Sequence, residues 1–273
     1  MCIITGEVRS FMERNLEKLH EVELEILVEV DRICRKYGIN YFLDSGSALG
    51  AIRHKGFIPW DDDIDIGMLR KDYVLFIQVA EKELAENFFL QTSVTDINYN
   101  KLHAKVRKNN TLFIENATSG RDMHQGIFID IFPFDNVPDY GGLLYIRVNQ
   151  FLQKLVVYQL NEKYEKIARY KIFLSRLVLG KNPQKRFDKF CNLFNNKDTK
   201  NITSFSYIDK EQLPFLREWF INTDDVLFEG RFFKIMRGWD GYLKRLYGDY
   251  MALPPIEKRQ THNALKVEVG EHM

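Results

Sequence analysis

The sequence predicts an α+β protein in which helices flank a mixed β-sheet core and a helical lobe is added. Two observations support this fold class. Helical and strand periodicities alternate along residues 20–138 and return in residues 200–262, whereas residues 140–196 show helical periodicity alone. No internal repeat or low-complexity linker separates these parts. We therefore expect a single domain over residues 1–273, with the lobe packed on the core.

Composition limits the classes of protein to consider. The chain has 273 residues, of which 45% are hydrophobic and 28% charged, as is typical of a soluble globular protein. Its formal net charge of +1 does not indicate a nucleic-acid partner. Three scattered cysteines are too few for a zinc site or a disulfide framework. There is no apolar run of about 20 residues and no signal-peptide pattern, so we expect a cytoplasmic protein.

The first elements are predicted to be a long helix, a short strand and a second helix. Apolar residues recur at helical spacing over residues 7–37 and stop at Gly38, and residues 39–43 form the strand. Ser47 is predicted to cap a helix that runs through Arg53. A helix N-terminus behind a small-residue turn can bind an anion, although Gly46-Ser47 alone is ordinarily only a turn.

The acidic segment that follows carries the most informative pattern. In a strand, Asp63 and Asp65 point to one face while Ile64 and Ile66 point to the other. Two carboxylates about 6–7 Å apart at Cα repel each other unless a cation lies between them. A solvated acidic turn is the ordinary alternative, but the interleaved isoleucines argue against it. The pattern predicts a divalent-metal site.

A calcium loop is a second alternative for the same segment. Asp61, Asp63 and Asp65 fit the first three ligand positions of an EF-hand, and Asp72 falls at the twelfth. However, Ile66 occupies the position where the loop needs glycine, and no entering helix precedes it. We therefore favour the strand.

The centre of the chain is predicted to hold a helix at residues 71–86 and strands at 88–94, 102–107 and 111–115. Lys105 and Arg107 lie on one face of their strand, where they either form a solvated edge or contact a phosphate. Asp130 is a single carboxylate within the apolar strand 126–134. An ionised carboxylate there is costly unless it pairs with Lys or Arg or binds a metal. We favour a third metal ligand.

The C-terminal half begins with helices at residues 143–179 and 183–194. Residues 140–190 contain eleven Lys and Arg against three acidic residues, which is either a solvated basic face or a surface for an anionic membrane. Strands at 226–228 and 232–236 and a helix at 239–246 complete the predicted core.

Several of the motifs described above together resemble a known sequence pattern. Gly46-Ser47, the Asp63-x-Asp65 pair and the later Asp130 together resemble the nucleotidyltransferase superfamily. More closely, residues 49–66, LGAIRHKGFIPWDDDIDI, look like the signature of the LicD family, as do residues 130–133 and 247–255. The resemblance spans residues 20–262. One departure concerns residues 228–238, which lack the proline that the family commonly has there.

The resemblance implies Mg²⁺-dependent transfer of an alcohol phosphate, typically phosphocholine, from a CDP-alcohol to a sugar hydroxyl. The acceptor would be a cell-surface glycan precursor such as teichoic acid or lipopolysaccharide, and relatives in the fukutin group are thought to transfer ribitol phosphate. Asp63 and Asp65 would hold one or two Mg²⁺ ions, with Mn²⁺ as a substitute. Asp130 would complete the metal shell and accept the proton of the attacking hydroxyl.

Further residues are implied to bind substrate. Gly46 and Ser47 would hold a donor phosphate, and charge on the leaving nucleotide would be neutralised by basic residues. The remaining candidates are Arg53, His54, Lys55, Lys105, Arg107, Arg259 and His262. If the acceptor is linked to a lipid carrier, the basic lobe would touch an anionic membrane at its inner face. Nucleotidyl transfer with release of pyrophosphate and a calcium-binding module without turnover are the alternative functions.

Overall fold

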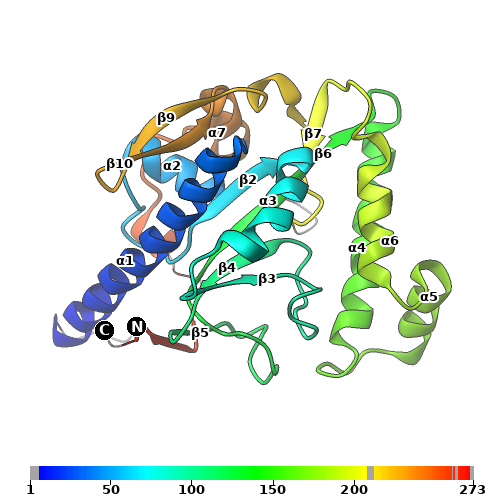
Figure 1. Ribbon diagram of the computed structural model, residues 1–273, viewed down its shortest axis with the longest axis horizontal. Helices are drawn as coiled ribbons and strands as arrows, with labels where there is room; N and C mark the ends of the chain where they lie inside the picture. The colour runs from blue at the N-terminus through cyan, green and yellow to red at the C-terminus, as the bar shows by residue number, and fades with distance from the viewer. Residues whose placement is uncertain (1–5, 208–211, 260, 262–263, 271–273) are drawn as a thin grey trace.

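A mixed β-sheet forms the centre of the molecule (Figure 1). The computed structural model describes the backbone of residues 6–207, 212–259, 261 and 264–270, and side chains from residue 15 onward. The main path of the sheet runs β3-β4-β6-β2-β1-β10-β9. In that order the strands are Phe88–Gln91, Ala104–Lys108, Phe128–Val137, Asp65–Leu69, Phe42–Leu43, Arg231–Met236 and Thr223–Phe228.

Four shorter strands extend or accompany this sheet. β7 (Asn201–Thr203) pairs with the end of β6, and β8 (Phe215–Leu216) pairs with β7. β5 (Leu112–Ile114) and β11 (Lys266–Glu268) form a separate two-stranded ribbon. The sequence did not predict β7, β8 or β11, because pieces of two or three residues are too short to show a period of two.

Helices cover the sheet. α1 (Gly6–Tyr37) and α3 (Arg70–Glu83) lie across the front of the sheet in Figure 1, and α2 (Ser45–Arg53) packs against α7 (Trp239–Tyr247) and β2. The buried face of α1 carries aliphatic side chains such as Ile26 and Val30, as the helical period predicts. Gly38 ends α1 with φ +64°, a conformation that favours glycine. The predicted α+β class, a mixed sheet flanked by helices, is confirmed.

The helical lobe has its own hydrophobic cluster. α4 (Gly142–Asn161), α5 (Arg169–Leu179) and α6 (Pro183–Cys191) pack on one another, apart from the sheet in Figure 1. Their cluster includes Leu155, Val156 and Phe187 and reaches the core through Val137 and Phe205. The helical stretch predicted over residues 143–179 is interrupted at 162–168. No helix in the described part of the chain is long and apolar enough to cross a membrane.

A buried ion pair joins the lobe to the sheet. The Arg70 guanidinium donates two hydrogen bonds to the carboxylate of Asp135 in β6, at 2.7 and 2.6 Å. Asp135 is fully buried, and Asp188 of α6 lies 3.7 Å from the same guanidinium. One arginine therefore ties α3, β6 and α6 together.

Candidate active site

Strand register brings the predicted carboxylates together. β2 and β6 are parallel neighbours, and Asp65 lies directly opposite Asp130. Asp63 lies just before β2, which begins at Asp65 and not, as predicted, at residue 63. One carboxylate oxygen from each of the three residues lies within 4.8 Å of the others. Ile64 and Ile66 are fully buried, so the predicted alternation of faces is correct.

The three carboxylates differ in their electrostatic surroundings. Burial, reinforced by the charges of Asp63 and Asp130, raises the pKa of Asp65 well above its usual range. Burial would also raise the pKa of Asp130, but Lys105 and His103 together hold it well below its usual range. Lys105 Nζ lies 2.9 Å from Asp130 Oδ1, and His103 Nε2 lies 3.0 Å from the same oxygen. The site therefore combines repulsion among its carboxylates with one carboxylate, that of Asp130, whose ionised form is stabilised by basic neighbours.

Lys105 and Arg107 do not form a solvated edge, so that prediction was wrong. Both are only 1% exposed, because β4 lies between β3 and β6 and is not an edge strand. Arg107 donates to Gln91 Oε1 and to the backbone carbonyl of Gly126, and its guanidinium stacks on the Phe128 ring. Both basic groups thus already have protein partners. The ammonium group of Lys105 belongs to the carboxylate site, whereas the guanidinium of Arg107 does not.

The N-terminus of α2 is capped differently from the prediction. The side chain of Asp44, not of Ser47, accepts the hydrogen bond from the backbone N–H of Ser45. Ser47 lies inside the helix, and its Oγ accepts a hydrogen bond of 2.9 Å from the backbone N–H of Asp65. Ser47 therefore positions β2 relative to α2.

Gly46 faces the acidic loop. A Cβ atom at this position would lie 2.6 Å from Asp61 Oδ2, closer than such atoms approach. Glycine is therefore required for the carboxylate of Asp61 to lie against the first turn of α2.

Asp44 is a functional candidate that sequence reasoning missed. It is fully buried and accepts hydrogen bonds from the hydroxyls of Tyr207 and Tyr242 as well as from the Ser45 amide. Burial raises its pKa to about 6, against the opposing effect of these donors. Its backbone N–H also donates to the Asp65 carbonyl. An aspartate between a strand and a small-residue turn was the available signal.

The predicted basic residues gather at the end of α2. Arg53 donates to the Tyr250 carbonyl (2.8 Å) and to His54 Nε2 (2.9 Å). The Arg259 guanidinium lies 4.7 Å from the centroid of the Trp60 ring, which His54 meets edge-on. Burial and the charge of Arg259 lower the pKa of Arg53, as expected for two cations held close together.

Two candidates remain, Lys55 and His262. Lys55 is exposed and has φ +63°, and His262 lies outside the described residues. The calcium-loop alternative is wrong, because the Asp72 carboxylate lies in α3 and accepts a hydrogen bond from the Asn40 amide (3.1 Å). In addition, Asp65 begins a strand where an EF-hand would continue as a loop.

The geometry defines a class: an α+β protein with three carboxylates gathered on neighbouring strands beside a helix N-terminus. The family model described as LicD/FKTN/FKRP, nucleotidyltransferase domain, matches residues 38–164. The lipopolysaccharide cholinephosphotransferase LicD of Haemophilus influenzae is 31% identical over 88% of this chain and 92% of its own length. The human ribitol 5-phosphate transferase FKRP is 51% identical over 35 residues, which is 13% of this chain and 7% of its own.

The chain belongs to the LicD family. It is therefore an enzyme, a phosphotransferase.

Proposed function

We propose that this enzyme transfers an alcohol phosphate from a CDP-alcohol to a sugar hydroxyl of a cell-surface glycan precursor, with Mg²⁺ held by Asp63, Asp65 and Asp130. The observation that carries the proposal is the cluster of these three carboxylates across β2 and β6. The Haemophilus influenzae relative is named for transfer of choline phosphate, and FKRP is named for transfer of ribitol 5-phosphate. Choline phosphate is the first candidate, because that relative covers most of the chain.

The donor set fits the proposed ion. Mg²⁺ binds hard oxygen ligands, and three carboxylates offer such oxygens within 4.8 Å of one another. The repulsion that helps to raise the pKa of Asp65 is what a divalent cation would relieve. When bound, the ion would neutralise charge on the diphosphate and orient it.

Asp130 is better suited to bind metal than to accept a proton. Lys105 and His103 stabilise its ionised form, so its low pKa makes it a weak base. Phosphoryl transfer through a loose transition state depends chiefly on positioning and charge neutralisation. We therefore assign Asp130 the role of metal ligand and assign Lys105 the role of holding it ionised and in place.

The donor phosphates would lie between the metal and the start of α2. The backbone amides there point out of the helix N-terminus, which favours an anion, and Gly46 lets the chain approach closely. Arg53 and Arg259 form the nearby cationic pair whose mutual repulsion an anionic nucleotide would relieve. Because the Arg259 guanidinium lies over the Trp60 ring, the proposed cytidine diphosphate would lie beside Trp60.

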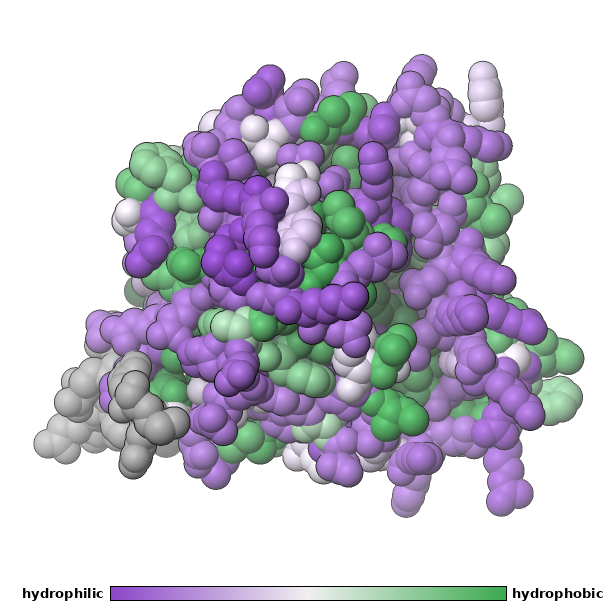
Figure 2. Space-filling model, in the orientation of Figure 1, coloured by the Kyte–Doolittle hydropathy of each residue, from purple (hydrophilic) through white to green (hydrophobic). Residues whose placement is uncertain are grey.

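The helical lobe would contact an anionic membrane at the inner face, where a lipid-linked acceptor is presented. Exposed apolar side chains recur along α5 at helical spacing, and Figure 2 shows apolar surface at the right-hand edge, over this helix. Basic residues flank this stripe. The stripe is Tyr170, Phe173, Leu174, Leu177 and Val178, and the flanking residues are Arg169, Lys171 and Arg176. Among the aromatic side chains of the lobe, Phe151 and Phe173 are exposed, whereas Tyr145 is buried.

The test is product analysis. The protein is incubated with Mg²⁺ and, separately, CDP-choline, CDP-ribitol, CTP or ATP, each with a glycan acceptor. Release of CMP from a CDP-alcohol together with phosphate transfer to the acceptor supports the proposal. Release of pyrophosphate from a nucleoside triphosphate would replace it with nucleotidyl transfer.

A further inference from the structure

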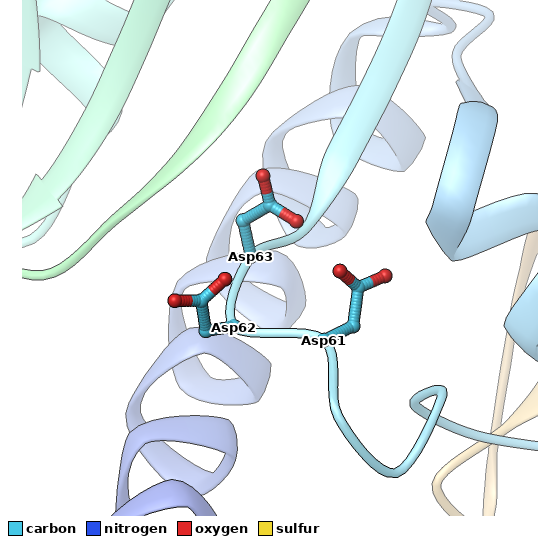
Figure 3. A group of neighbouring side chains, drawn as sticks. All are labelled: Asp61, Asp62 and Asp63. Carbon is cyan, nitrogen blue, oxygen red and sulfur yellow. The ribbon is translucent and has the colours of Figure 1, made fainter. Parts of the chain in front are cut away.

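The proposed metal site has a donor side and an opposite side. Asp63 projects with Asp61 and Asp62 from the turn that leads into β2, with a helix passing behind (Figure 3). This turn and the start of α2 border the site where the donor phosphates are proposed to lie. β6 and β4 follow β2 in the other direction along the sheet, and there His103 Nε2 lies 3.0 Å from Asp130 Oδ1. His103 therefore borders the site on the side away from the donor.

A polar cleft between the core and the helical lobe begins at His103. Its inner part, of about 250 Å³, lies between α3, the segment that leads into β4 and α6. Its outer part, of about 720 Å³, follows α6. Ser93, Val94, Gln184 and Asp188 line both parts, so the two adjoin. The outer volume alone lies in the range of about 300–1,000 Å³ that is typical of ligand sites.

Gln184 has an unsatisfied hydrogen-bond donor at this cleft. Its Nε2 atom is buried and has no hydrogen-bond partner among residues 15–207, 212–259, 261 and 264–270. A buried amide without a partner costs free energy. The residue as a whole is only half-buried, so its amide can turn into the cleft. A ligand hydroxyl that accepts a hydrogen bond from Nε2 would remove the cost.

The lining of the cleft favours a ligand rich in hydroxyl groups. Charged side chains of both signs are present, such as Lys189 and Asp188, so the lining does not select a strongly charged ligand. Hydroxyl and amide side chains both donate and accept hydrogen bonds, as sugar hydroxyls do. The uncharged polar residues of this kind are Thr92, Ser93, Thr95, Gln184, Asn192 and Asn196.

The loop on the core side of the cleft is held in place by its own hydrogen bonds. Thr95 Oγ1 donates to the Leu90 carbonyl at 2.7 Å and accepts from the backbone N–H of Thr92 at 2.9 Å. These bonds fix Ser93 and Val94 at the edge of the cleft. A preformed edge lowers the entropy that is lost when a ligand binds.

We propose that this cleft binds the sugar chain of the acceptor, with the reacting sugar beside His103 and the following sugars along α6. The proposal rests on the proposed function, because that function supplies the glycan and the position of the metal. The cleft ends one side chain away from the carboxylates, since His103 lies against Asp130. Ser93 and Gln184 line both parts of the cleft, so they are assigned to acceptor binding.

The test is binding of the full-length protein to an array of lipid-free oligosaccharides, without any donor. We expect the wild type to bind a set of them and Gln184→Leu to bind the same set about tenfold more weakly. The melting temperature of Gln184→Leu should stay the same or rise, because the replaced Nε2 atom has no partner to lose. A purely structural role of Gln184 would instead lower the melting temperature and leave binding unchanged.

A second variant blocks the cleft. Ser93→Trp places an indole where the two parts adjoin and should abolish binding. Gln78→Leu and Ser119→Trp are the matched controls, because they make the same changes at exposed positions outside the cleft. Both controls should bind as the wild type does. Thermal melting verifies that each variant folds.

The outcomes separate the cleft from the proposed function. No oligosaccharide binding by the wild type, or unchanged binding by either cleft variant, overturns the acceptor site. If the protein then still releases CMP from a CDP-alcohol with transfer to a glycan, the proposed function stands without this cleft. Weakened binding in both cleft variants, with no turnover of any CDP-alcohol, would support the cleft as a glycan site and contradict the proposed function.

Discussion

Asp65 and Asp130 face each other across two parallel strands although 65 positions separate them in the chain. β2 and β6 are both interior strands of the sheet, so their backbones have little freedom to shift. The two carboxylates are thus held together by the hydrogen-bond register of the sheet, and the mutual repulsion that results is built into the fold.

Replacing Asp63 or Asp65 by Asn should abolish transfer and leave the fold intact. Each change removes a proposed metal ligand and also removes repulsion among buried carboxylates, so the metal-free protein should melt at the same or a higher temperature. CMP release from a CDP-alcohol and thermal melting in EDTA provide the two measurements. Asp122→Asn, at an exposed position, is the control that should change neither. Near-normal activity in either variant contradicts the assigned site.

Asp130→Asn should also abolish transfer, but at a cost in stability. It removes the nearer carboxylate partner of the Lys105 ammonium, whose side chain is 2% exposed, and leaves Glu115 at 3.7 Å. Loss of one member of a buried pair typically costs about 3–5 kcal/mol. The double variant Lys105→Met with Asp130→Asn should recover most of that stability without recovering activity. Denaturant unfolding measures the stability of the single and the double variant. Equal stability of Asp130→Asn and wild type would contradict the burial of this ion pair.

Much of this site could be predicted from local patterns. The period of two around Asp63, and the single carboxylate in the apolar run around Asp130, required no knowledge of the fold. The burial of Lys105 could not be predicted, because it depends on which strands flank β4. The capping role of Asp44 was missed because Ser and Asp are comparably good caps and both stood in the turn. The burial of Glu23 could be predicted, since this residue lies among the apolar positions of α1, such as Leu19 and Ile26, at helical spacing.

Asp44 should make stability fall with rising pH. Its pKa is raised to about 6 in the folded protein from an ordinary value of 3.8, so the folded state binds this proton more tightly than the unfolded state. The contribution is fully present below about pH 4 and is lost as pH rises through about 6, a change of about 3 kcal/mol. Comparison with Asp44→Asn in EDTA isolates it, because the stability of the wild type relative to this variant should fall across that range. A constant difference contradicts the shift.

Mg²⁺ and a CDP-alcohol together should raise the melting temperature more than either alone. A ligand that binds only the folded state at a hundred times its Kd adds about 2.7 kcal/mol of stability. The joint effect follows if the ion bridges the carboxylates and the diphosphate. Thermal scans with CDP-choline, CDP-ribitol and ATP measure it. Strong stabilisation by ATP and none by cytidine nucleotides would point to nucleotidyl transfer.

The lobe should bind anionic vesicles reversibly and in a salt-sensitive way. Each basic residue near anionic lipid contributes about 1 kcal/mol, which salt screens. Replacing Arg169, Lys171, Arg176 and Lys181 by Glu should abolish binding, and Phe173→Ser with Leu177→Ser should weaken it at every salt concentration. Turnover of a soluble acceptor should survive both.

Arg231→Glu with Arg245→Glu, exposed on the core, is the charge control. Vesicle flotation measures binding. If the protein does not bind vesicles at low salt, the basic face of the lobe is an ordinary solvated surface.

The strand β6 joins the proposed metal site to the lobe in one unbroken segment. All ten of its residues are buried, it carries Asp130 near its start, and the Arg70–Asp135 pair fixes its far end beside α6. From Asp130 to Val137 an extended strand covers about 23 Å. If the lobe rests on a bilayer, this strand would fix the distance between the carboxylate site and the lipid surface. The enzyme would then select acceptors by how far the reacting sugar stands from its anchor, a preference that a panel of lipid-linked glycans of increasing length would reveal.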